Sequence, residues 1–180
     1  MKLAPGPLKF ATGAVFGAAL IAASISPRVN RSNLVGLERL ADSKVVAVDP
    51  NTPGEALGKT RGVYIEKFGA VFTTEVDLIP HAAPNPFRPP HKDAEVTKLR
   101  MDKQARVGVL RQRMVETMVL MAKSLDGIPP NENIALAVTI PYWPWEKSAG
   151  MPQQILIQAP KAALLLGGDS LSSALKVQEF

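Results

Sequence analysis

Histidine and carboxylate side chains gather near the middle of the chain, and these residue types bind divalent metal ions. Glu75 and Asp77 share one face of a predicted strand, and His81 and His91 flank the proline-rich segment that follows. Imidazole and carboxylate groups that converge suit zinc or a similar ion. Their spacing matches no known metal motif, and carboxylates on the wet face of a strand are usually solvated. A metal-dependent enzyme or metal-binding protein built on these four residues is therefore only the alternative function, and we expect no metal or cofactor.

No other pattern indicates catalysis. Both histidines lie beside the proline-rich segment, the chain has no cysteine, and no serine sits in a Gly-x-Ser-x-Gly elbow. The pair Gly167-Gly168 lacks the strand, the lysine and the spacing of a phosphate-binding loop, and it is typical of a helix stop. We therefore predict no catalytic residues and a non-enzymatic function.

The most unusual local feature is Tyr142-Trp143-Pro144-Trp145, which contains both tryptophans of the chain. Proline restricts the backbone here, so the aromatic side chains would lose little conformational freedom on binding. Rigid aromatic groups on a loop provide contact surface for a glycan, a proline-rich peptide or a protein. The alternative is that they close the core at the edge of the sheet. Tyr142, Trp143 and Trp145 are our first candidate binding residues.

A second candidate surface is the basic face of a long predicted helix, from which we select Arg100, Lys103 and Arg106. Six basic residues between positions 98 and 113 would suit an anionic lipid or a cell-wall polymer. The net charge of +5 is modest and no nucleic-acid-binding module is recognisable, so nucleic acid is not an expected partner. The alternative is an ordinary solvated helix face.

The long helix is predicted over residues 94–125, with Asp93 as its N-cap and Gly127 beyond its end. Apolar residues recur every three or four positions and form one stripe: Val107, Leu110, Met114, Met118, Met121 and Leu125. Arg100 and Lys103 fall on the same stripe. We therefore expect the first half of the helix to project past the core, with the stems of these side chains reaching toward solvent.

Alternation of apolar and polar residues predicts a β-hairpin over 62–79, with its turn at Lys67-Phe68-Gly69. Further strands are predicted at 134–140, 154–159 and 176–180, with a short helix at 161–166 and a helical turn at 170–174. Small residues on one face of 134–140 would let the long helix pack closely there. The order ββ, long α, ββ, short α, β predicts a two-layer α+β fold with a mixed sheet.

The N-terminal part of the chain divides into two further segments before a single α+β domain at 61–180. Residues 1–26 are typical of a signal peptide or N-terminal anchor, because Lys2 and Lys9 precede an uncharged apolar run. That run is short for a membrane-spanning helix, which favours cleavage near Ser24; a retained anchor would hold the protein at the membrane. Residues 27–60 are predicted to be a weakly structured lead-in, with a short helix capped by Asn33, an extended piece at 44–48 and a turn at 49–54.

The stretch from Gly62 to Phe72, the long helix and the closing strand after a glycine-punctuated helix resemble a group of uncharacterised exported bacterial proteins. The resemblance extends over roughly residues 61–180. It implies a bacterial origin and export, and it implies no activity because none is known for the group. The resemblance and the N-terminal segment indicate the periplasm or cell envelope, and the two candidate contact surfaces favour a binding or scaffolding domain there. Its partner would be an envelope protein or polymer, and the oligomeric state stays open.

Overall fold

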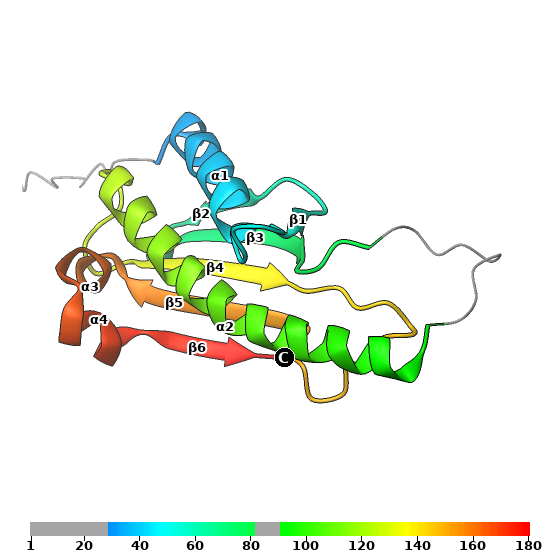
Figure 1. The fold of residues 1–180 in the computed structure, drawn as a ribbon. Coiled ribbons are helices and arrows are strands. Elements are labelled where there is room, and N and C mark those ends of the chain that lie inside the picture. Colours follow the sequence, from blue (N-terminus) through cyan, green and yellow to red (C-terminus); the bar gives the residue numbers. More distant parts are fainter. Residues whose placement is uncertain (1–28, 82–90) are drawn as a thin grey trace, which may run out of the picture.

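The computed structural model describes residues 29–81 and 91–180 (Figure 1). Within these residues the fold is α+β, with four helices and a mixed sheet of six strands. The helices are α1 (Arg31–Val45), α2 (Asp93–Ser124), α3 (Lys161–Leu166) and α4 (Gly168–Ala174). The strands are β1 (Glu55–Ala56), β2 (Arg61–Ile65), β3 (Gly69–Asp77), β4 (Asn133–Thr139), β5 (Gln154–Pro160) and β6 (Lys176–Glu179).

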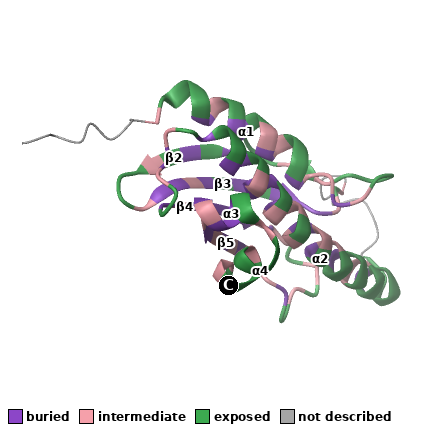
Figure 2. Cartoon of the chain, turned by 90° about the vertical axis from the view of Figure 1, so that its left-hand side faces the viewer, coloured by how far each residue is buried: buried purple, intermediate pink, exposed green. Residues whose placement is uncertain are grey.

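The strands run in the spatial order β1-β3-β4-β5-β6, and β2 pairs with β3. β2 and β3 form the predicted antiparallel hairpin, in which Val63 lies opposite Val71. β3 and β4 are parallel, because the chain returns through α2 before it forms β4. β5 and β6 then add antiparallel. The predicted two-layer arrangement is confirmed: α1 and α2 cross one face of the sheet, and the buried residues lie mainly in the strands and on the helix sides that face them (Figure 2).

The predicted stripe of α2 is the centre of the core. All six of its residues are at most 3% exposed, and they pack in one cluster with the inner row of the sheet. That inner row on β4 consists of Ile134, Leu136 and Val138. The prediction that α2 packs on the small residues of this strand was wrong. Ala135 and Ala137 face the other side, because the larger apolar side chains gain more by burial beneath the helix.

The turn between β2 and β3 depends on glycine. Gly69 has φ +124°, a backbone conformation that side chains with a Cβ rarely adopt, and Lys67 has φ 67°. A Cβ atom at Gly69 would also collide with the carbonyl oxygen of Asn133 at the start of β4. This close approach allows the Asn133 N–H to donate to the Phe68 carbonyl at 2.7 Å, which aligns β4 with the hairpin.

The segment before the hairpin is more ordered than predicted. Helix α1 begins at Arg31, and the side chain of Asn30, not of Asn33, caps it by accepting from the Ser32 N–H at 3.2 Å. The helix continues to Val45, so the predicted extended piece at 44–48 was also wrong. Four apolar residues of α1 join the core with α2: Leu34, Leu37, Ala41 and Val45. The sequence predicted only a short helix here, and packing against α2 is what makes a 15-residue helix stable.

The ends of α2 differ slightly from the prediction. Lys92, not Asp93, is the N-cap, and its backbone N–H donates to the Glu95 carboxylate at 3.3 Å. At the other end the helix stops at Ser124, where the buried Lys161 ammonium donates to the carbonyls of Leu125 and Ile128 at 2.7 and 3.0 Å. This lysine therefore holds the turn that follows α2, in which the Ile128 N–H also donates to the Leu125 carbonyl at 3.1 Å. None of the helices within the described residues is long and apolar enough to cross a membrane.

Candidate functional site

Residues 140–153 connect β4 to β5 and carry the aromatic sequence. The loop is folded back on itself by backbone hydrogen bonds, among them Glu146 N–H to Trp143 C=O at 2.9 Å and Met151 N–H to Ser148 C=O at 2.9 Å. The Tyr142 hydroxyl donates across the loop to the Pro152 carbonyl at 3.0 Å. Burial, together with the nearby Glu146 carboxylate, raises the pKa of the Tyr142 phenol to about 12. The phenol therefore keeps its proton, and can keep donating, further into the alkaline range than an ordinary tyrosine.

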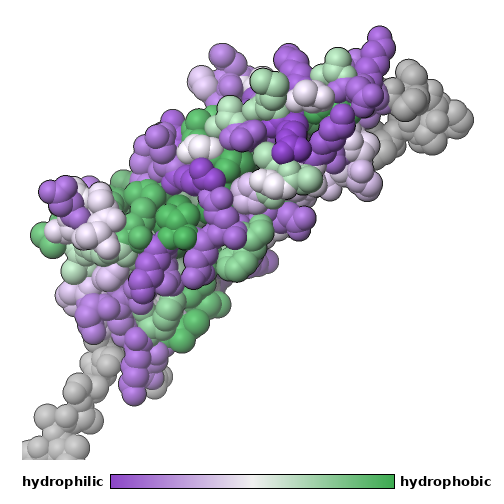
Figure 3. Space-filling model, turned by 90° about the horizontal axis from the view of Figure 1, so that it is seen from below, coloured by the Kyte–Doolittle hydropathy of each residue, from purple (hydrophilic) through white to green (hydrophobic). Residues whose placement is uncertain are grey.

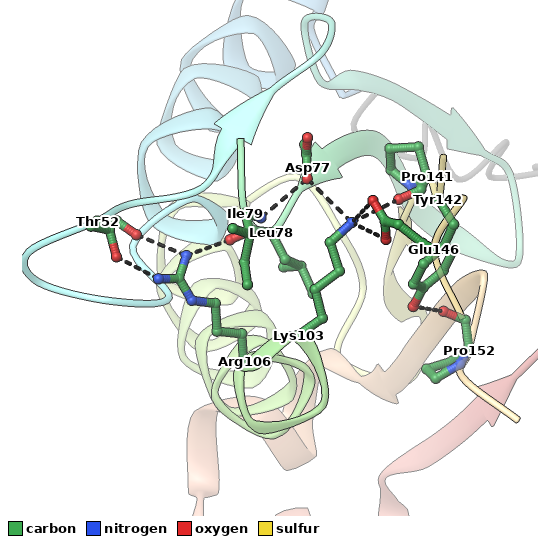
Figure 4. Close-up of polar contacts among 10 residues, drawn as sticks. All are labelled: Thr52, Asp77, Leu78, Ile79, Lys103, Arg106, Pro141, Tyr142, Glu146 and Pro152. Carbon is green, nitrogen blue, oxygen red and sulfur yellow. Dashed lines mark hydrogen bonds and ion pairs between the residues drawn. The ribbon is translucent and has the colours of Figure 1, made fainter. Parts of the chain in front are cut away.

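A buried ion cluster lies beneath this loop (Figure 4). The Lys103 ammonium lies 2.8 and 2.9 Å from the two carboxylate oxygens of Glu146, and 3.6 Å from a carboxylate oxygen of Asp77. The same nitrogen lies 5.0 Å from the centre of the Tyr142 ring, within cation–π range. The side chains of Lys103, Glu146 and Asp77 are only 1%, 4% and 10% exposed. The cluster thus joins three distant parts of the chain: α2, the end of β3 and the aromatic loop.

This arrangement corrects the prediction that the first half of α2 projects past the core as far as Lys103. The first two turns of α2 are largely exposed, but Lys103 is buried. The position of Lys103 on the apolar stripe could have indicated that it is buried and that it pairs with a carboxylate, because a buried lysine needs such a partner. Glu146 was missed as that partner, since it is 43 positions away in the sequence.

The other two basic candidates also make contacts within the chain. Arg100 donates to the Ala149 carbonyl of the aromatic loop at 2.7 Å. Arg106 donates to the carbonyls of Thr52 and Leu78 at 2.9 and 2.5 Å and also contacts the Thr52 hydroxyl (Figure 4). These side chains therefore help to hold the loops together at this end of the sheet.

The two tryptophans have different surroundings. Trp145 stacks on His91 with ring centroids 3.9 Å apart, and His81 meets it edge-on at 5.6 Å. Among the residues that the structure describes, no aromatic ring covers Trp143 in this way, and it is 36% exposed. Neither tryptophan belongs to the hydrophobic core cluster, although Tyr142 packs against it. The aromatic sequence therefore presents one tryptophan to solvent and holds the other against the two histidines.

A cavity of about 330 Å³ opens beside Trp143. We call the cavity wall the aromatic loop surface; it is formed by Thr139, Ile140, Pro141, Tyr142, Trp143, Pro144, Glu146, Ser148 and Gln153. Hydroxyl and amide groups lie there next to an aromatic ring, and the one charged member, Glu146, is paired with Lys103. A space of this size is at the lower end of those that hold small ligands. The space beside Lys103, Tyr142 and Glu146 is too small to hold even a water molecule.

The residues of the alternative metal site do not come together. Asp77 faces Lys103 and also accepts from the Ile79 N–H at 3.1 Å, whereas Glu75 is exposed. His81 and His91 lie on Trp145. Within residues 29–81 and 91–180, no group of three or more histidines, cysteines or carboxylates is placed to hold a metal ion.

The chain was compared with protein-family models, curated proteins and solved structures, and none of these comparisons gives a match. The resemblance to exported bacterial proteins and the proposed binding function therefore stay predictions. The predicted signal peptide or anchor lies outside the described residues.

Proposed function

We propose that this protein is an exported, non-enzymatic domain that binds a partner in the bacterial cell envelope through the aromatic loop surface. The observation that carries the proposal is the contrast between Trp143 and the groups beneath it. The Trp143 side chain is 36% exposed, whereas the Glu146 side chain three positions later is 4% exposed and paired with Lys103. The loop is thus anchored in the protein interior while its aromatic tip meets solvent.

Anchoring matters because binding is weakened when a flexible loop must be ordered. The backbone hydrogen bonds from Glu146 and Met151, the Tyr142 hydroxyl and the Lys103 pair all restrain this loop before any partner arrives. A tryptophan that is already positioned loses little conformational entropy on contact. This supports a binding role rather than a purely structural one for Trp143.

The chemistry of the aromatic loop surface favours a neutral partner with an apolar face and hydroxyl or amide groups. A sugar ring or an extended peptide can stack on Trp143 while Thr139, Ser148 and Gln153 make hydrogen bonds. Strongly anionic ligands are less suited, because the basic groups nearby already have partners within the chain. We therefore propose a cell-wall glycan as the partner, with an envelope protein as the other outcome of the test.

Co-sedimentation with purified peptidoglycan tests this proposal directly. Wild-type protein should pellet with the polymer, and Trp143→Ala should reduce the bound fraction at least about tenfold, as expected for an exposed aromatic contact. Leu166→Ala is the matched control: it removes a side chain that is 76% exposed on α3, and it should bind like wild type. Equal binding of wild type and Trp143→Ala would refute the proposal for this surface. Capture of a single envelope protein that depends on Trp143 would replace the glycan by that protein.

Export is tested separately. Mass spectrometry of the native protein should show a chain that begins near Ile25 and is recovered from the envelope or periplasmic fraction. An intact Met1 on cytoplasmic protein would contradict this part of the proposal.

A further inference from the structure

The aromatic loop surface contains one residue of a strand, Thr139 at the end of β4. Thr139 lies opposite Glu75 of β3 on one side and opposite Gln154 of β5 on the other. The Gln154 side-chain amide donates to the Thr139 hydroxyl at 3.4 Å. Residues that lie opposite each other in a sheet point to the same face. The cavity beside Trp143 therefore opens onto the sheet face that carries these three side chains.

This outer face of the sheet is turned away from α1 and α2 (Figure 2). Because successive residues of a strand point to opposite faces, the core residues of β4 and β5 leave their neighbours on the outer face. Strand pairing places two further rows of side chains behind Thr139. The first row is Thr73, Ala137 and Leu156, and the second is Val71, Ala135 and Gln158. The outer face thus continues the cavity wall along β4.

The middle of the outer face is lower than its sides. Ala135 and Ala137 are only 2% and 8% exposed, although neither belongs to the core cluster. Larger side chains on β3 and β5 stand on both sides of these alanines and shield them. A flat ligand can therefore lie over β4 and contact the side chains of both neighbouring strands.

The outer face offers side chains to a ligand, but not backbone groups. β4 pairs with β3 on one side and with β5 on the other over Asn133–Thr139, so its N–H and C=O groups are already used. A peptide strand that joins a sheet depends on such backbone groups. A sugar chain instead uses its hydroxyl groups, which can bond to the side chains of Thr73, Gln154 and Gln158. The arrangement therefore favours a sugar chain over an extended peptide.

The charges on the outer face favour a neutral chain. Glu75 is exposed beside Thr139, whereas Arg61 and Lys176 lie farther away, on β2 and β6. A carboxylate at the mouth of the cavity repels an anionic polymer, but it can accept hydrogen bonds from sugar hydroxyls. On the side of the molecule that carries β6, hydrophobic groups also lie among polar ones (Figure 3). Such a mixed surface suits sugar rings, which have apolar faces and polar edges.

We infer that the aromatic loop surface and the outer face form one extended site for a neutral polysaccharide, which lies along β4 with one end on Trp143. The inference rests on the proposed function and adds that the site takes several sugars in a row. Thr139 and Ala135 are four residues apart, a distance of about 13 Å along a strand, which is longer than one sugar ring. Thr73 and Gln158 therefore contact sugars beyond the one on Trp143.

Isothermal titration calorimetry of the full chain with oligomers of N-acetylglucosamine, a sugar of the bacterial cell wall, tests the inference. The tetrasaccharide should bind wild type at least about tenfold more tightly than the disaccharide, because the longer chain reaches hydrogen bonds beyond the cavity. The double variant Thr73→Ala, Gln158→Ala should lose this difference and keep the disaccharide affinity of wild type. The matched control Thr97→Ala, Gln112→Ala changes exposed side chains of α2 and should bind both oligomers like wild type.

Two results would overturn the extended site: equal binding of the two oligomers by wild type, or a double variant that still prefers the tetrasaccharide. The proposed function stands in both cases if Trp143→Ala weakens disaccharide binding at least about tenfold. If wild type binds neither oligomer, the extended site and the glycan partner both fall. The comparison of two chain lengths on wild type does not depend on the folding of any variant.

Discussion

Removal of the buried Lys103 charge is the sharpest test of how the aromatic loop is held. In Lys103→Met the stem of the side chain is preserved, but the carboxylates of Asp77 and Glu146 lose their shared cation. A buried ion pair that loses one partner typically destabilises a protein by about 3–5 kcal/mol. The side chains here are at most 10% exposed, so little of this cost is relieved by solvent.

For a domain of this size, about 3–5 kcal/mol corresponds to a fall in Tm of roughly 6–20 °C. Thermal unfolding followed by circular dichroism measures this, with Lys98→Met as the control on the exposed part of α2. The control should remain within about 0.5 kcal/mol of wild type. A triple variant in which Lys103→Met is combined with Asp77→Asn and Glu146→Gln should recover much of the loss, because no unpaired charge is left inside.

The result that would refute this reasoning is a Lys103→Met variant as stable as Lys98→Met. The interpretation from sequence alone places Lys103 on a projecting helix end and predicts that outcome. It also predicts that Lys103→Asp hardly changes the Tm. The structure predicts that Lys103→Asp is the more damaging of the two Lys103 variants, since it places a third carboxylate beside two others.

Three further predictions concern the fold. Met118→Asp should abolish cooperative unfolding in circular dichroism, because the methionine is fully buried and the new charge has no partner. Gly69→Ala should cost at least about 2–3 kcal/mol in urea unfolding, whereas Gly36→Ala, in a helix with open space around it, should be neutral or stabilising. Burial raises the pKa of Glu38, but hydrogen bonds from α1 and β2 outweigh it and hold the pKa below its ordinary 4.5. The ionised Glu38 carboxylate therefore stabilises the folded protein above pH 4.5, and this stabilisation is lost as the pH falls through the lowered pKa of the folded state. Glu38→Gln should accordingly lose less stability than wild type on acidification, measured by urea unfolding at several pH values.

The fold class and most elements follow from local sequence patterns. The apolar stripe of α2 repeats at helical spacing, and the hairpin alternates at strand spacing, so each pattern specifies both the element and its buried face. The turn before Gly69 was likewise visible, because glycine marks a position with positive φ. These features depend on residues close together in the sequence, which is why one sequence is enough to find them.

The site required tertiary structure. The contact between Lys103 and Glu146 joins residues 43 positions apart, and no periodicity records which carboxylate a buried lysine will meet. The aromatic sequence looked the same whether exposed or buried. The loop fold and the two histidines decide that Trp143 is exposed and that Trp145 is partly buried.

The edges of the sheet also separate what local sequence patterns predict from what only the tertiary structure decides. β2 and β6 were both predictable as strands from their composition, but α1 covers only β2. The sequence by itself determined the elements and their apolar faces, because these follow from neighbouring residues. The tertiary structure alone decided which charge is buried, which tryptophan is exposed and which edge is open, because these depend on where distant segments meet.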